Sequence, residues 1–238
     1  MGLRIATNMA AMAASRAVSR SSEDQTKVYE RLSSGQRINH AGDDAAGLSI
    51  SENLRGQIRS LTQAERNAND GISFAQVAEG GLTEIGNIMI RLRELAIQAG
   101  SDTVGDKERG FINNEATSLV SEVDRIANST TFAGTPLLNG QSSKSDLEFQ
   151  VGTRNDESDR ILFNTSENDV RASTIGVDGL DYSSIDSARD AIDKVDNAMG
   201  TIFGARARLG ATQNKLHSTV NNLQIAKVLD QWVVKNVK

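Results

Sequence analysis

The chain has 238 residues, of which 38% are hydrophobic and 4% aromatic, with one proline, no cysteine and a formal net charge of −5. This acidic balance argues against nucleic-acid binding as the default function, and without cysteine neither a disulfide nor a thiolate metal site can form. No apolar run approaches the roughly 18 residues of a membrane-spanning helix, so we expect no membrane partner.

The first 22 residues form a basic segment that contains Arg4, Arg16 and Arg20 and has no acidic residue before Glu23. It lacks an apolar core long enough for a secretory signal, but an arginine-rich, acid-poor start is also typical of an organelle transit peptide. A frayed amphipathic terminal helix is the other interpretation. Apolar side chains recur through the first 32 residues, and we expect them to form an assembly segment: Leu3, Ile5, Met9, Met12, Val18, Val28 and Leu32.

A polar connector follows this segment. The helical pattern ends at Gly35, a residue that readily accepts a left-handed helix C-cap. Asn39 to Asp43 then interrupt the pattern, and Asp43 is predicted to cap a second helix that starts near Asp44.

Two helical segments with apolar residues three and four positions apart come next, near residues 74–99 and 112–126. We expect them to bury one narrow face, here called the bundle seam. Its members in these two segments include Ile85, Ile88, Leu92, Ile112, Leu119 and Val123.

Several glycines lie inside the predicted helices, and each costs roughly 0.8 to 1 kcal/mol relative to alanine. We expect close approach of another backbone at Gly81, which lies on the seam, or at the pair Gly200 and Gly204 in the last helix. A kink or hinge is the alternative.

The pattern changes to a period of two in the middle of the chain. Leu147, Phe149 and Val151 alternate with polar residues, as do Ile161 and Phe163 after a turn-rich stretch. This predicts a two-stranded hairpin. Because a lone hairpin is only marginally stable, we expect it to lie on the helices and to cap one end of the bundle.

The last quarter of the chain has the longest seam. Its apolar members include Ile192, Val195, Met199, Ile202, Leu209 and Leu216, and only Arg206 and Gln213 interrupt it with polar side chains. The fold expected from all these segments is mainly α: an elongated antiparallel helical bundle with a small β-hairpin region.

The sequence offers little catalytic chemistry. His40 and His217 are far apart, without a second ligand at metal spacing, and no phosphate-binding loop or nucleophile elbow is present. The acidic residues between Asp178 and Asp193 lack the spacing of a calcium loop. We therefore expect no enzyme activity and no cofactor or metal.

Residues 31–99, beginning RLSSGQRINHAGDDAAGLSI, resemble the amino-terminal signature of bacterial flagellin. The similarity extends through NNEATSLVSEVDRIANSTTFAGTPLLNG and returns at LEFQVG and at GARARLGATQNKLHSTVNNLQIA. It covers the chain from near residue 1 to about residue 227, apart from a variable middle. The resemblance favours flagellin over a transit peptide, and specifically a minimal flagellin without large outer domains.

The resemblance implies a structural subunit of the flagellar filament that is exported unfolded, is located outside the cell and folds its termini on assembly. The implied regions are an inner-layer helix and spoke, disordered in the monomer (1–43), a bundle core (44–140), a hairpin and variable loop (141–182), the last bundle helix (183–227) and an atypical tail (228–238). Ser and Thr within 141–175 are implied glycosylation candidates.

The resemblance also implies partners. They are other copies in a homo-polymer, the flagellar export apparatus, hook-associated and cap proteins, and the vertebrate Toll-like flagellin receptor. For that receptor it assigns Arg91, Leu95 and Glu115 as the recognition patch, although Leu95 also lies on the seam and has a core position as its alternative role.

The similarity fails after residue 227, where the sequence ends VLDQWVVKNVK. Flagellins continue there through a helix that pairs with the amino-terminal segment and engages an export chaperone, so chaperone binding is doubtful. A truncated or paralogous flagellin, acting as a soluble or junction protein that does not polymerise by itself, is the alternative function.

Overall fold

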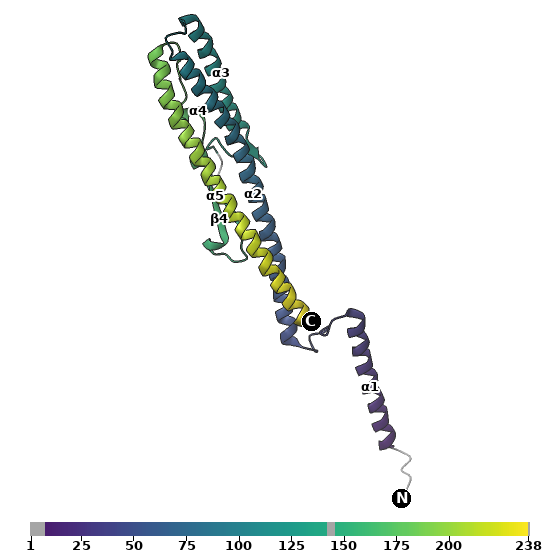
Figure 1. The fold of residues 1–238 in the computed structure, drawn as a ribbon. Coiled ribbons are helices and arrows are strands. Elements are labelled where there is room, and N and C mark those ends of the chain that lie inside the picture. Colours follow the sequence, from purple (N-terminus) through teal and green to yellow (C-terminus); the bar gives the residue numbers. More distant parts are fainter. Residues whose placement is uncertain (1–7, 142–145, 238) are drawn as a thin grey trace. The chain divides into compact units, whose positions relative to one another are not determined.

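The computed structural model describes residues 8–141 and 146–237 and is dominated by four long helices (Figure 1). These are α1 (Met9–Ser34), α2 (Ala45–Ala99), α3 (Asp106–Ser129) and α5 (Ile185–Val237). The short elements are β1 (Thr131–Phe132), β2 (Thr135–Pro136), β3 (Asp146–Gln150), η1 (Glu157–Asp159), β4 (Arg160–Asn164), η2 (Ser166–Asn168) and α4 (Ala172–Ile175).

The chain divides into two compact units. Unit 1 comprises Met1–Ser60 and Ile225–Lys238, and unit 2 comprises Leu61–Gln224. The long helices α2 and α5 therefore contribute residues to both units.

Unit 2 is a bundle in which α2, α3 and α5 lie side by side (Figure 1). Its core contains the seam residues Ile85, Leu92, Ile112, Val123, Val195, Ile202 and Leu209, while Ile88, Leu119, Ile192 and Met199 are partly buried against it. Leu216 is fully buried in a second cluster with Ala68, Ile72, Val151 and Val220. The predicted mainly α fold, an antiparallel bundle with a small hairpin region, is confirmed.

The predicted close approach of another backbone is not what surrounds these glycines. A Cβ added at Gly81 would lie 2.8 Å from side-chain atoms of Leu138 and Thr130, so side chains and not a backbone approach this glycine most closely. At Gly200 nothing lies within 4 Å, and at Gly204 only the Arg208 guanidinium does. The prediction for Gly200 and Gly204 is wrong because that side of α5 faces open space.

The hairpin forms as predicted but lies elsewhere on the bundle. β3 and β4 are antiparallel, with Leu147 opposite Phe163 and Phe149 opposite Ile161. The hairpin lies along the side of α2, where the rings of Phe149 and Phe163 pack edge-on against Phe74 at 5.6 and 4.6 Å. The prediction that it caps an end of the bundle is therefore wrong. Because α3 ends at Ser129, the hairpin covers the flank of α2 that α3 leaves open.

The segment that leads into α5 is anchored by Tyr182, which is fully buried. Its hydroxyl donates a hydrogen bond to the carbonyl of Leu92 in α2 at 3.3 Å, and its backbone N–H donates to Asn113 in α3 at 3.0 Å. Burial raises the pKa of the Tyr182 phenol to about 12. One residue thus connects the segment before α5 to both α2 and α3.

The last helix continues further than the sequence pattern indicates. α5 runs without a break to Val237, so the described residues from 228 on, assigned above to an atypical tail, continue the same helix. No glycine or proline occurs after Gly210, so nothing in the backbone chemistry of this stretch terminates the helix.

Candidate assembly surfaces

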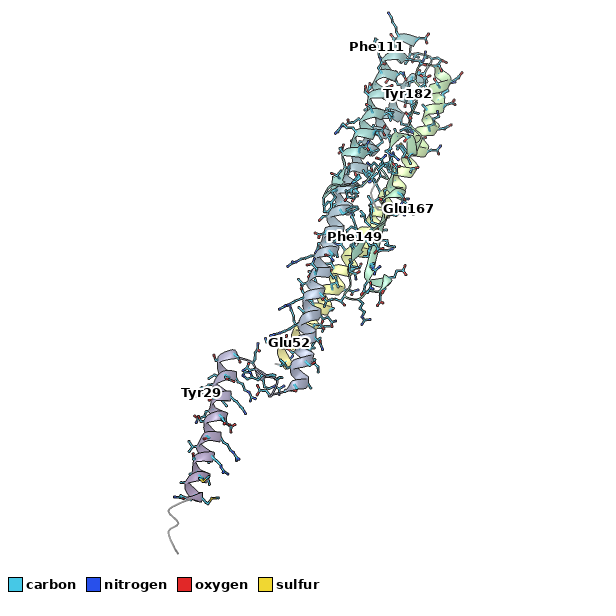
Figure 2. All side chains as sticks on the ribbon, turned by 180° about the vertical axis from the view of Figure 1, so that it is seen from behind. Tyr29, Glu52, Phe111, Phe149, Glu167 and Tyr182 are labelled. Atoms are coloured by element: carbon cyan, nitrogen blue, oxygen red, sulfur yellow. The ribbon has the colours of Figure 1, made fainter. Side chains whose placement is uncertain are left out.

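Helix α1 buries none of its residues. Five members of the predicted assembly segment are exposed on it, namely Met9, Met12, Val18, Val28 and Leu32, and Tyr29 is exposed beside them (Figure 2). The other two members, Leu3 and Ile5, lie outside the described residues. A helix with this many uncovered apolar side chains presents a surface for packing against another polypeptide.

The connector after α1 is an ordered polar turn. Gly35 adopts the left-handed conformation with φ of 64°, and its N–H donates to the carbonyl of Arg31 at 2.9 Å, as predicted for a C-cap. Across the turn, Arg31 lies 3.5 Å from Asp43, and His40 lies 3.2 Å from Glu30. These contacts connect the end of α1 to the connector.

The predicted cap of α2 is off by one residue. Asp43 instead accepts hydrogen bonds from the backbone N–H groups of His40 at 3.1 Å and Asn39 at 3.2 Å, and these bonds hold the pKa of its carboxyl below the usual value. Asp44 caps the helix, because its carboxylate accepts from the N–H of Gly47 at 2.9 Å. The helix starts at Ala45, so the cap position falls one residue later than expected.

The end of α5 is a second uncovered apolar surface. Four exposed residues at helical spacing form a stripe, here called the tail stripe: Ile225, Val228, Leu229 and Trp232. Positions separated by three, four and seven residues lie on one helix face. This surface was not predicted, although the same spacing is visible in the sequence.

The residues of the predicted receptor patch have different environments. Arg91 and Glu115 pair across α2 and α3 at 2.8 Å, and Arg91 also lies 3.1 Å from Glu94. Both Arg91 and Glu115 are about half exposed. Leu95 is 1% exposed and belongs to the core, so only the charged pair is accessible in unit 2.

Large apolar side chains accompany this pair on the surface of unit 2. Phe111 is 72% exposed near the end where α2 passes into α3 (Figure 2). Ile90 and Ile97, seven residues apart and therefore on one face of α2, are about half exposed. Periodicity alone did not identify Phe111, since its neighbour Ile112 takes the seam position.

The described residues contain no cluster of candidate metal ligands. Within 8–141 and 146–237, no group of three or more His, Cys, Asp or Glu side chains could hold a metal ion. No helix in this part of the chain is long and apolar enough to cross a membrane.

These features define a protein of the long-helix bundle class with uncovered apolar surfaces on its terminal helices. Residues 5–143 match the sequence profile of the bacterial flagellin N-terminal helical region. Flagellin FlaB1 of Treponema pallidum (strain Nichols) is 42% identical over 233 residues, with 92% of this chain and 80% of the relative covered. The flagellin of Bacillus subtilis (strain 168) is 40% identical over 253 residues, covering 93% and 82%.

A solved structure agrees with the sequence comparisons. The crystal structure of Bacillus cereus flagellin is similar with a TM-score of 0.59 and 28% sequence identity, over 66% of this chain and 88% of that one. The chain belongs to the bacterial flagellin family.

Proposed function

We propose that this chain is a structural subunit of the bacterial flagellar filament that serves motility, polymerises with other copies of itself and has no catalytic role. The observation that carries the proposal is the exposure of apolar side chains along the terminal helices of a chain whose relatives are flagellins and filament core proteins. Each such side chain stabilises a structure by roughly 1.5 to 3 kcal/mol, but only when it is buried. A subunit interface would supply that burial.

The terminal helices are the proposed assembly surfaces. Residues 1–43 would form the inner layer and the spoke of a filament and order fully on assembly, and the tail stripe would pack against such segments. Contacts of this kind, repeated between different surfaces of successive copies around a helical axis, produce an open polymer.

Further proposed partners follow from family membership. They are the flagellar export apparatus, which would pass the unfolded chain to the outside of the cell, and the hook-associated and cap proteins at the filament ends. An export chaperone is not proposed, because residues 228–238 depart from the family motif.

A soluble or junction role is the less favoured alternative, since the curated relatives are named flagellin or filament core protein.

Seeded elongation tests the proposal. Purified protein is added to short seeds sheared from Bacillus subtilis flagellar filaments, and the products are measured by electron microscopy. Lengthening of the seeds supports the filament role. Persistent monomers, with residues 1–40 open to protease, would support the soluble alternative.

The charged pair also supports a proposed receptor contact. We infer that Arg91 and Glu115 would be the accessible part of a patch recognised by the vertebrate Toll-like flagellin receptor, with the buried Leu95 holding α2 in place beneath them. Replacing Arg91 by alanine should reduce signalling strongly, because the guanidinium is the exposed donor of the pair. A receptor reporter assay measures this.

Arg125→Ala is the matched control, since Arg125 forms a similar exposed ion pair with Glu122 on α3. Unchanged signalling potency of the Arg91→Ala protein would contradict the assignment of Arg91 to the receptor patch.

A further inference from the structure

An aromatic pocket opens on unit 2 beside α2. It has a volume of about 560 Å³ and is lined by three rings and four other side chains from α2, the β1–β2 hairpin and β3: Phe74, Phe132, Phe149, Ala133, Thr135, Leu147 and Glu148. The rings already pack edge-on, because Phe132 and Phe149 lie 5.8 and 5.6 Å from Phe74. Pockets of about 300 to 1,000 Å³ bury ligands of drug size, so this one has room for an aromatic side chain and its neighbours.

The turn at the edge of the aromatic pocket holds an unfavourable backbone conformation. Ala133, between β1 and β2, has a φ of 48°, in the left-handed region that residues other than glycine rarely adopt. Its side chain is exposed, so packing within the chain does little to compensate for this conformation. Strained backbone of this kind concentrates at binding sites and ligand clamps. The pocket therefore resembles a binding site in its backbone as well as in its shape.

A side chain that fits the pocket is present elsewhere on unit 2. Phe111 of α3 is the most exposed aromatic residue in the described part of the chain, at 72%, and we call it the aromatic knob. Lys107, one helical turn before it, is exposed and forms no ion pair within the described residues. At the pocket, the Glu148 side chain is 52% exposed and lies 3.5 Å from Arg160. Knob and pocket therefore match in apolar character and in charge.

The knob cannot reach the pocket of its own chain. Glu115, one turn after Phe111 on α3, contacts Arg91 of α2 at 2.8 Å. Arg91 lies more than four helical turns, or roughly 25 Å, along α2 from Phe74. Figure 2 shows the same separation, with Phe111 near one end of the unit 2 bundle and Phe149 further along it. A contact between knob and pocket therefore needs a second copy.

We propose that the Phe111 ring of one copy enters the aromatic pocket of the next copy, with Lys107 placed beside Glu148. The inference rests on the proposed filament role and adds a contact between the unit 2 bundles of successive subunits. Edge-to-face packing against Phe132 and Phe149 suits the ring. Knob and pocket are different patches of the same bundle, so the contact is heterologous, the kind from which open helical polymers are built.

Photo-crosslinking tests the contact whether or not filaments form. p-Benzoyl-phenylalanine replaces Phe111, and the protein is irradiated both in elongated seeds and in concentrated unseeded solution. Mass spectrometry should identify crosslinks to the tryptic peptides 126–144 and 145–154 of a second copy, which contain Phe132 and Phe149. The same probe at Phe203, an exposed ring on α5, is the matched control and should not label these peptides.

Substitutions test the two parts of the contact. Phe111→Ala should raise the monomer concentration needed for elongation roughly 10- to 100-fold, whereas Phe203→Ala should not. With the probe at position 111, Lys107→Glu should lower the crosslink yield, and adding Glu148→Lys should restore it. The expected charge effect is small, because exposed ion pairs are weak.

The outcomes separate this contact from the filament role. Elongation without crosslinks from position 111 to the two peptides would overturn the contact and leave the filament role in place, as would unchanged elongation of Phe111→Ala. Crosslinks in unseeded solution without elongation would support the contact and count against the filament role. The absence of both crosslinks and elongation would overturn both proposals.

Discussion

Replacing Val28 and Leu32 of α1 by aspartate should stop seeded elongation while leaving the melting of unit 2 unchanged. These side chains are 59% and 78% exposed, so the monomer loses little packing when they are replaced. If both become buried between subunits, their loss removes about 3 to 6 kcal/mol of assembly free energy. That corresponds to an increase of roughly 10²- to 10⁴-fold in the monomer concentration at which seeds lengthen. Sedimentation of polymer over a series of protein concentrations measures this threshold concentration.

The same helix provides a control that adds identical charge. Thr26→Asp with Ser33→Asp changes two exposed polar positions of α1 and should leave elongation close to that of the unmodified protein. An equal loss of elongation in this control would show that the added charge causes the effect. Elongation of the Val28→Asp, Leu32→Asp protein at the parent concentration would show that this part of α1 is not an assembly surface.

The bundle was predictable because its signal is local and repeated. Ile85, Leu92 and Ile202 recur at three- and four-residue spacing, and a helix places such residues on one face whatever the rest of the chain does. The hairpin was predictable for the same reason, since Leu147 and Phe149 alternate with polar residues.

The position of the hairpin was not predictable from local pattern. It depends on where α3 ends and on three rings that meet Phe74 from separate segments, those of Phe132, Phe149 and Phe163. Nothing in the spacing of these residues indicates that they share one neighbour. The one-residue error at the cap of α2 has a related cause, because Asp43 and Asp44 are chemically identical and only the geometry of the turn assigns their roles.

The exposed surfaces also divide into those that local sequence pattern predicts and those that it does not. The apolar residues of α1 were identified from composition, whereas the tail stripe was overlooked because the chain there departs from the family motif. For Leu95 both roles were open, and burial selects the core. Arg109 was not singled out at all. A basic residue in a charged first turn is usually solvated, and its burial depends on the turn that folds over it.

Replacing Arg109 by alanine should be among the most destabilising single changes in unit 2. Arg109 is only 5% exposed, and its guanidinium donates to the carbonyl of Ala99 at 3.0 Å and to that of Ser101 at 3.1 Å, while Asp106 accepts from it at 2.9 Å. It therefore satisfies the carbonyl of Ala99 at the end of α2, which has no partner within the helix, and adds a second donor to the carbonyl of Ser101, which also accepts from the Val104 N–H at 3.3 Å. Leaving the Ala99 carbonyl without a donor costs about 1 to 3 kcal/mol.

The expected loss is about 2 to 5 kcal/mol, or a melting midpoint lowered by roughly 5 to 20 °C, measured by thermal and urea unfolding. Arg109→Lys keeps the charge beside Asp106 but lacks the planar group that donates to two carbonyls in fixed directions. Its loss of stability should therefore be smaller than that of Arg109→Ala but still measurable. Arg125→Ala, an exposed change on the same helix, should leave the melting midpoint close to that of the parent. If Arg109→Ala unfolds at the parent midpoint, the end of α2 is not held by this guanidinium, and solvent or the turn itself must satisfy the two carbonyls.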